Sequence, residues 1–172
     1  MISSAYYHLP VVDEFRYITD EPINLGILLS KAHRPGAGAV VLFSGETRDS
    51  SDGKAVWVLE YEAHPSMAAK MIRAILQEAI DRWGLHFAIA QHRTGQVNIS
   101  ESAVVVVTGA PHRSEAYAAN RFIIDKIKHE VPIWKCEHFT DGSKVWSEGC
   151  NHEQKVVPAL SAEVPAKADT TV

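Results

Sequence analysis

The chain has 172 residues, a formal net charge of -4 and a hydrophobic content of 46%. This length suits one domain with a substantial core, and the composition excludes a chain that is disordered throughout. The negative net charge argues against a general nucleic-acid or acidic-membrane binder, so a site for an anion must be a local concentration of basic residues.

Cysteine spacing and the length of the apolar runs bear on the compartment. Cys136 and Cys150 lie 14 positions apart, which indicates neither a zinc ribbon nor a dithiol redox motif. No run approaches the roughly 18 apolar residues of a membrane span, and the first residues do not form a signal peptide. We therefore expect a soluble, cytoplasmic protein with reduced thiols.

The two ends of the chain differ from its middle. Residues 1–14 show no clear period, and residues 151–172 are rich in alanine, proline and small polar residues. We expect an N-terminal extension over 1–16, a single domain over 17–150, and a mobile C-terminal tail over 151–172.

The first part of the domain predicts a short helix and two strands. Asp20 is a candidate N-cap, with Pro22 in the first turn and Ile23, Ile27 and Leu28 facing inward. Residues 38–45 are an apolar run between glycines, which is typical of a buried strand. A polar loop over 46–53 precedes a returning strand over 56–61, where apolar residues alternate.

The second part predicts two longer helices within a set of strands. Apolar residues recur at helical spacing from 65 to 83, with Gly84 as the stop, and again along the helix that carries Lys128. The run 103–108 is apolar on both faces, as in a central strand, and 133–139 with 143–146 predict a hairpin. The class is α+β: a mixed sheet with two main helices, a short N-terminal helix and a C-terminal β-hairpin.

Two lysines stand on either side of a predicted helix break. Pro132 lacks an amide donor and disfavours helical geometry at Val131, so Lys128 lies in a last helical turn and Lys135 in an extended segment. A cation at a helix C-terminus is also an ordinary structural feature. In a partly desolvated pocket beside other cations, however, such lysines become usable nucleophiles or bases.

A second basic group begins the helix that ends near Lys128. His112 and Arg113 adjoin the backbone amides of a helix start, which attract phosphate or carboxylate. Arg48 would reach the same place if the two preceding strands ended at one edge of the sheet. That all three are solvated loop residues stays an open alternative.

Metal and hydrolase chemistry have little support in the sequence. The nine histidines are dispersed and show no His-x-x-x-His spacing, so we expect no metal site and no bound cofactor. There is no Gly-x-Ser-x-Gly elbow, and the run 38–45 lacks the Gly-Lys-Ser/Thr ending of a phosphate loop.

Taken together, several stretches resemble the large, catalytic subunit of molybdopterin synthase. They span residues 17–148 in order and are the runs 18–23, 38–49, 59–67, 92–95, 110–116 and 124–135. The most specific are Ala-Pro-His-Arg-Ser-Glu-Ala at 110–116 and Lys-Ile-Lys-His-Glu-Val-Pro-Ile-Trp-Lys at 126–135. Two positions depart from the pattern, because Cys136 replaces a basic residue and Glu46 replaces a small or basic one.

The resemblance implies a sulfur transfer. A small ubiquitin-like subunit would insert its C-terminal Gly-Gly thiocarboxylate into a pocket of this chain, and two sulfurs would pass in turn to cyclic pyranopterin monophosphate, which gives the dithiolene of molybdopterin. It also implies a homodimer within a heterotetramer. Lys128 and Lys135 match the catalytic positions. The implied substrate-binding residues are Glu46, Thr47, Arg48, His112, Arg113, Lys128, Lys135, Cys136 and Glu137.

Two other functions remain open at this point. One is a non-catalytic module that binds a partner's C-terminal tail in a basic groove. The other is a small phosphoesterase or nucleotide-binding enzyme that uses His112.

Overall fold

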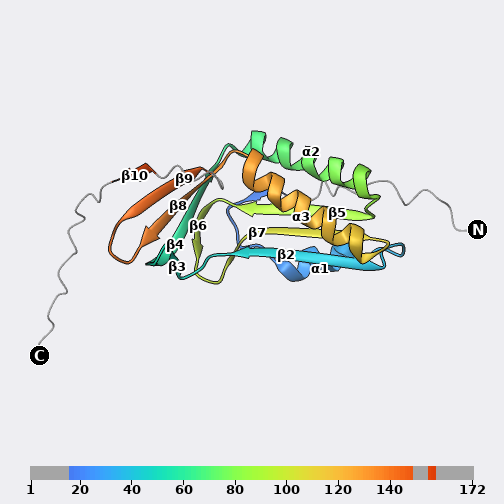
Figure 1. Ribbon diagram of the computed structural model, residues 1–172, viewed down its shortest axis with the longest axis horizontal. Helices are drawn as coiled ribbons and strands as arrows, with labels where there is room; N and C mark the ends of the chain where they lie inside the picture. Colours follow the sequence, from blue (N-terminus) through green and yellow to red (C-terminus); the bar gives the residue numbers. More distant parts are fainter. Residues whose placement is uncertain (1–15, 149–154, 158–172) are drawn as a thin grey trace, which may run out of the picture.

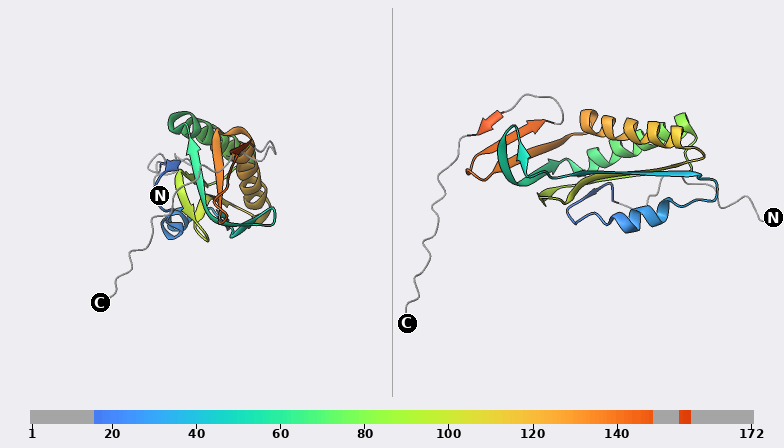
Figure 2. Two further views of the ribbon diagram at one scale, coloured as in Figure 1. Left: turned by 90° about the vertical axis from the view of Figure 1, so that its left-hand side faces the viewer. Right: turned by 60° about the horizontal axis from the view of Figure 1, so that its bottom comes forward.

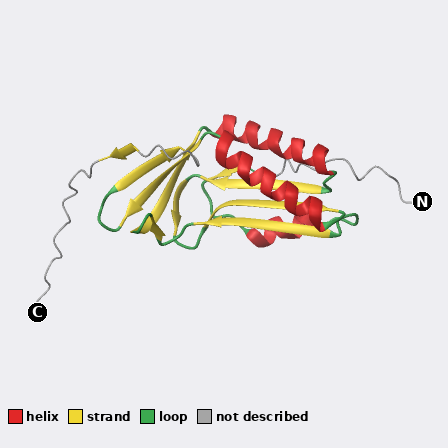
Figure 3. Cartoon of the chain, viewed as in Figure 1, coloured by secondary structure: helices red, strands yellow, loops and turns green. Residues whose placement is uncertain are grey.

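The computed structural model describes residues 16–148 and 155–157, and its helices and strands confirm the α+β class (Figure 1). The strands form two sheets that follow one another along the long axis of the molecule (Figure 3). Cys150 and most of the predicted extension and tail lie outside the described residues. Within those residues, no helix is long and apolar enough to cross a membrane.

The first sheet has the strand order β1-β5-β7-β2. β1 (Ile18–Thr19) runs parallel to β5 (Phe87–Arg93), which makes the sheet mixed. β7 (Ser102–Ala110) is antiparallel to β5 and to β2 (Ala39–Glu46). β7 is therefore the central strand, as its apolar run predicts, and all but its first residue are buried.

Helices cover both faces of this sheet (Figure 2). α2 (Pro65–Trp83) and α3 (Arg113–Glu130) pack on one face, and α1 (Leu25–Ala32) packs on the other. Alternate residues of β5 and β7 therefore enter two hydrophobic clusters. Ala88, Ala90, Val104 and Val106 belong to the larger cluster with α2 and α3, and Phe87, Ile89, Val105 and Val107 to the smaller one with α1.

The second sheet has the order β10-β9-β8-β4-β3, and a further strand, β6, pairs with β4. Its strands are β3 (Ser50–Ser51), β4 (Lys54–Ala63), β6 (Gly95–Asn98), β8 (Ile133–Phe139), β9 (Lys144–Glu148) and β10 (Lys155–Val157). β8 and β9 form the predicted closing hairpin. β6 and β10 are strands that the sequence pattern does not predict, because each is short and gains its hydrogen bonds from another strand, β6 from β4 and β10 from β9.

The N-terminal helix begins later than its sequence predicts. Asn24, not Asp20, is the N-cap, and its side chain accepts the amide of Ile27 at 3.0 Å. This start places Leu28 and Ala32 against the sheet, while Ile27 is 49% exposed. The prediction that Ile27 faces inward is therefore wrong, because Leu28 and Ala32, four residues apart, form the buried stripe and Ile27 lies about 100° around the helix from Leu28.

The two long helices begin and end where local signals predict. α2 ends at Gly84, whose φ of 60° is the left-handed geometry that favours glycine. α3 ends at Glu130, and Val131 is already extended, with φ -80° and ψ 130°, ahead of Pro132. The chain then enters β8, so the predicted helix break is confirmed.

Candidate active site

A polar cavity of about 160 Å³ lies where the end of α3 meets the second sheet. Its lining comes from β2, β3, β4, β8, α3 and the connection after β2, and consists of Glu46, Arg48, Ser50, Ser51, Val56, Leu59, Tyr61, Lys128, Lys135 and Glu137. We call it the lysine pocket. It gathers three basic side chains in a chain whose net charge is -4, so positive charge is concentrated here.

The helix break places Lys128 and Lys135 in this one pocket. Lys128 is in the last turn of α3, and Lys135 lies in β8 opposite Tyr61 of β4. Lys126 differs from Lys128 by two residues, which is about 200° around a helix. Its Nζ lies 2.9 Å from a carboxylate oxygen of Glu78 in α2 and 3.4 Å from one of Glu130. Lys126 is thus held on another face of α3.

Glu137 is the counter-ion of Lys135. Lys135 Nζ is 2.8 Å from Glu137 Oε1, and Ser51 Oγ donates to the same oxygen at 3.1 Å. Alternation along β8 puts both residues on one face of the strand. Burial, and then the carboxylate of Glu137, raise the pKa of Tyr61 above its ordinary value. The Tyr61 phenol therefore stays protonated at neutral pH.

Cys136 lies between these two residues and faces the other side of β8. It is buried, and its thiol is absent from the lining of the lysine pocket. Burial, followed by the carboxylate of Glu60, raises the pKa of Cys136 to about 11. The thiol is therefore protonated at neutral pH, and the predicted part of Cys136 in binding could come only from its backbone.

Glu46 and Arg48 reach the pocket from either side of Thr47. Thr47 is 2% exposed, and its Oγ1 donates to the carbonyl oxygen of Val97 at 3.3 Å. Its side chain therefore holds the segment to β6 and does not line the pocket.

His112 and Arg113 lie elsewhere in the chain. With Gly38, Ala39, Pro111 and Ser114 they line a separate cavity of about 530 Å³. A Cβ on Gly38 would collide with the carbonyl oxygen of Pro111, so this approach of the two segments requires glycine. Lys128, the residue of α3 in the lysine pocket, lies 16 positions after His112, which is about 24 Å along the helix.

The expectation that Arg48 and His112 share one edge of the sheet is wrong within a single chain. β2 and β7 are antiparallel, with Ala39 opposite Ala110 at one end and Glu46 opposite Ser102 at the other. The end of β2, which leads to Arg48, and the end of β7, which leads to His112, therefore lie at opposite ends of the sheet.

Comparison with known proteins identifies the family. A model described as MoaE protein matches residues 18–130. The chain belongs to the MoaE family. Its relatives include the molybdopterin synthase catalytic subunit of Nostoc sp., 39% identical over 138 residues that cover 80% of this chain and 84% of that protein. The protein of the same name from Bacillus subtilis is 41% identical over 127 residues, which cover 74% and 81%.

Solved structures of MoaE-like proteins agree with the fold. The molybdopterin synthase from Staphylococcus aureus superimposes with a TM-score of 0.72 at 38% identity, over 76% of this chain and 95% of that one. A protein–protein complex of subunits 1 and 2 of molybdopterin-converting factor from Helicobacter pylori gives 0.63 at 21% identity, over 78% and 90%, and so shares the fold. The resemblance noted in the sequence is confirmed, as is membership of a family of enzymes.

His92 is a residue of this MoaE-family chain that sequence reasoning passes over. It is buried beside the pocket wall, with its ring in edge contact with Tyr61 at a centroid distance of 5.0 Å. Burial, and then the charge of Lys128, lower its pKa to about 3. The ring is therefore neutral, and its Nδ1–H donates to the carbonyl oxygen of Arg93 at 2.8 Å. No local sequence signal marks it, because its surroundings come from β4 and α3.

The described residues of this MoaE-family chain contain no group of three or more histidine, cysteine, aspartate or glutamate side chains placed to hold a metal ion.

Proposed function

We propose that the chain is the catalytic subunit of a molybdopterin synthase. The reaction proposed for it is the transfer of sulfur from the C-terminal thiocarboxylate of a small ubiquitin-like subunit to cyclic pyranopterin monophosphate. The observation that supports this most is the lysine pocket, where Arg48, Lys128 and Lys135 meet at the end of α3. The names of its relatives, which are molybdopterin synthase catalytic subunits, point to the same reaction.

The charges of the reactants fit this pocket. A thiocarboxylate and a cyclic phosphate are both anions, so a site that holds them together needs several cations. Glu137 neutralises part of the charge of Lys135. The three basic and two acidic side chains of the lining together give the pocket one excess positive charge. In each transfer a C–S bond forms on the pterin side chain as a C–O bond there breaks, and the displaced oxygen leaves with the ring-opened phosphate or as water. Water adds to the acyl carbon of the small subunit as its C–S bond breaks, which leaves a carboxylate.

The two lysines take distinct parts in this proposal. Lys128, at the helix end, faces the thiocarboxylate as a transition-state cation or transient acyl acceptor. Lys135, held by Glu137 at 2.8 Å, is the fixed cation that orients the substrate. The slender Gly-Gly tail suits a cavity of about 160 Å³. The Helicobacter pylori neighbour, which is a complex of two subunits, is in keeping with such a partner.

A homodimer would bring His112 and Arg113 to the lysine pocket. β2 is an edge strand, and its residues Val40, Val41 and Leu42 are half-buried while Phe43 is 37% exposed. An apolar open edge of this kind is suited to pairing with a second chain. Twofold pairing would make the two β2 strands antiparallel, so the end of β2 that leads to Arg48 would face the start of the second β2.

The start of β2 lies beside the helix start that carries His112. Ala39 pairs with Ala110, two residues before His112. In such a dimer, His112 and Arg113 of the second copy would therefore approach Arg48 of the first. All the basic residues implied by the resemblance could then act on one phosphate.

Turnover tests the proposed function. The purified chain, a thiocarboxylated small subunit and cyclic pyranopterin monophosphate should together yield a dithiolene product. Tight binding of the small subunit without product would leave only the tail-binding module, and phosphate release without a sulfur donor would indicate a phosphoesterase.

Mixed dimers test the shared site. Lys128→Ala and His112→Ala/Arg113→Ala homodimers should both be nearly inactive. Random mixing of the two should restore about a quarter of wild-type activity, because half of the dimers then contain one complete site. Absence of any recovery in dimers shown to exchange would contradict the shared site.

A further inference from the structure

Arg93, the last residue of β5, is a buried cation outside the lysine pocket. Its side chain is 7% exposed, its Nη1 lies 2.6 Å from Glu101 Oε2, and its Nη2 donates to the carbonyl oxygen of Gln96 at 3.0 Å. Burying a guanidinium is costly even when it is paired. The buried Arg93–Glu101 pair does not line the lysine pocket, so its role has to be found in the segments that it holds in place.

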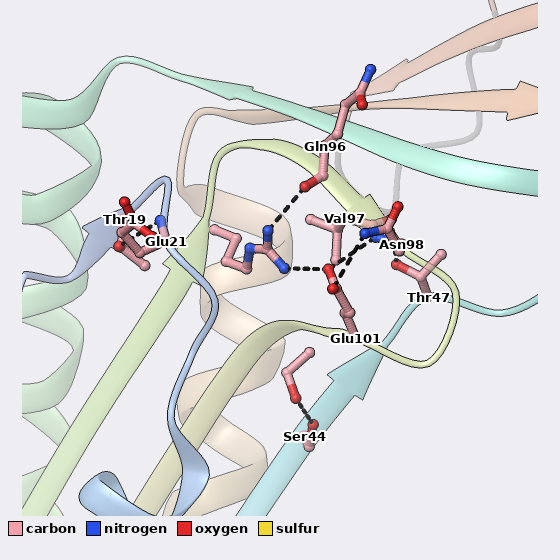
Figure 4. Close-up of polar contacts among 10 residues, drawn as sticks. Thr19, Glu21, Ser44, Thr47, Gln96, Val97, Asn98 and Glu101 are labelled. Carbon is pink, nitrogen blue, oxygen red and sulfur yellow. Dashed lines mark hydrogen bonds and ion pairs between the residues drawn. The ribbon is translucent and has the colours of Figure 1, made fainter.

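Glu101 closes the turn that follows β6. Its Oε2 also accepts the amide of Asn98 at 3.1 Å, and its Oε1 accepts the Asn98 side chain at 3.2 Å. Figure 4 shows Glu101 beside Asn98 and Thr47 in this region. We call residues 97–101 the Glu101 turn. The hydrogen bonds from Arg93 and Asn98 lower the pKa of Glu101, so the carboxylate is ionised at neutral pH.

The Glu101 turn in turn holds Thr47 by three hydrogen bonds. The Thr47 amide donates to the carbonyl oxygen of Glu101 at 3.1 Å, and the Ser100 amide donates to the carbonyl oxygen of Thr47 at 2.9 Å. The third is the bond from Thr47 Oγ1 to Val97. On the other side of Arg48, the carbonyl oxygen of Asp49 accepts the amide of Val56 at 2.8 Å. The backbone of Arg48 is thus fixed at both neighbouring residues.

We propose that Arg93 and Glu101 are positioning residues that set Arg48 in the lysine pocket through the Glu101 turn and Thr47. This inference rests on the proposed function and deepens it. Arg48 has a long, exposed side chain, so a fixed backbone reduces the ordering that must accompany substrate binding. Loss of the Arg93–Glu101 pair should therefore raise KM for the pterin substrate more than it lowers kcat.

A double-mutant cycle tests whether Glu101 acts through Arg48. Glu101→Ala should raise KM for cyclic pyranopterin monophosphate by about five- to tenfold in the wild-type background, and by less than about twofold in Arg48→Ala. Glu101→Gln keeps one acceptor oxygen, which can still bind Arg93 and the Asn98 amide but not the Asn98 side chain as well, and it should recover part of the loss. Equal increases of KM in both backgrounds would overturn the proposal.

Asn120→Ala is the control for a general loss of stability. Asn120 is buried in α3 and donates to the carbonyl oxygens of Val41 and Val106, away from the lysine pocket. The Asn120→Ala variant should have a lower Tm than wild type but should not show the rise in KM expected for Glu101→Ala. A rise in KM equal to that of Glu101→Ala would show that destabilisation alone is responsible, and would also overturn the positioning role.

Amide hydrogen exchange separates failure of this proposal from failure of the proposed function. Wild-type protein that makes no dithiolene would count against the function, whereas the positioning role can still be measured. Glu101→Ala should speed exchange at the Thr47 and Ser100 amides by about tenfold or more, with α3 unchanged. It should also weaken binding of inorganic phosphate in the wild-type background but not in Arg48→Ala. Unchanged exchange at Thr47 would refute the proposal whether or not the protein is active.

Discussion

The two lysines of α3 provide a matched test of the catalytic assignment. Lys128 and Lys126 are the same residue type two positions apart, yet only Lys128 lines the lysine pocket. Two unit charges about 4 Å apart at an effective dielectric constant of about 20 interact by about 4 kcal/mol. Only the increase in this interaction energy between the ground state and the transition state raises the rate. We therefore expect Lys128→Ala to lower kcat by about 10²- to 10³-fold, as for other preorganised charged donors.

Lys126→Ala should affect stability alone. It removes two partly exposed ion pairs, at 2.9 Å and 3.4 Å, whose contribution to stability is small because solvent screens them. Its sulfur-transfer rate should stay within about twofold of wild type, since the side chain lies away from the pocket. The assay is single-turnover formation of dithiolene with thiocarboxylated small subunit in excess, alongside a measurement of Tm for each variant.

Lys128→Arg distinguishes the two roles proposed for Lys128. An arginine keeps the charge but is not a nucleophile, so a transition-state cation should be partly replaced, and an acyl acceptor should not. A Lys128→Ala protein that keeps a rate within about threefold of wild type would refute the catalytic assignment. So would an equal loss in Lys126→Ala.

Groups in and beside the pocket can be tested by ligand binding, by the pH dependence of stability and by alkylation. Glu137→Gln removes the carboxylate 2.8 Å from Lys135 Nζ and should tighten binding of inorganic phosphate about two- to fivefold by calorimetry, whereas an unchanged or weaker Kd would contradict its role as counter-ion. Below pH 6.5 the unfolded state takes up a proton at His92, whereas the folded state, in which the His92 pKa is about 3, does not. The contribution of neutral His92 to the free energy of unfolding is therefore fully present above pH 6.5 and is lost as the pH falls toward 3. Between pH 7 and 5, wild type should therefore lose about 2 kcal/mol more unfolding free energy than His92→Gln, and parallel curves would exclude this. Because the pKa of Cys136 is raised to about 11, peptide mapping should find it unlabelled by iodoacetamide at pH 8 until the protein is unfolded, and rapid native labelling would show that the thiol is accessible.

The membership of Thr47 in the site illustrates how sequence and structure differ as sources. The resemblance implies that the backbone of Glu46 and Thr47 helps to bind the substrate, and this stays a prediction. The burial of the Thr47 side chain and its bond to Val97 show that the side chain itself supports the neighbouring residues. The partner segment, residues 97–101, is about 50 positions away, and no local pattern connects the two.

Features that depend on local backbone chemistry can be predicted from short stretches of the sequence. Pro132 ends α3 because it lacks an amide donor, and Gly84 ends α2 because it tolerates a positive φ. Apolar periodicity was sufficient to predict α2, α3 and the central strand β7. The break between Lys128 and Lys135 was thus readable from a few neighbouring residues.

Which of these residues meet depends on contacts between distant parts of the chain. Because β2 and β7 are antiparallel, His112 and Arg48 lie at opposite ends of the first sheet. The pairing of β4 with β8 brings Tyr61 to Lys135, and the face of α3 that packs toward α2 takes Lys126 away from Lys128. Register and helix rotation are set by contacts between residues far apart in the chain, so the composition of the lysine pocket could not follow from local sequence.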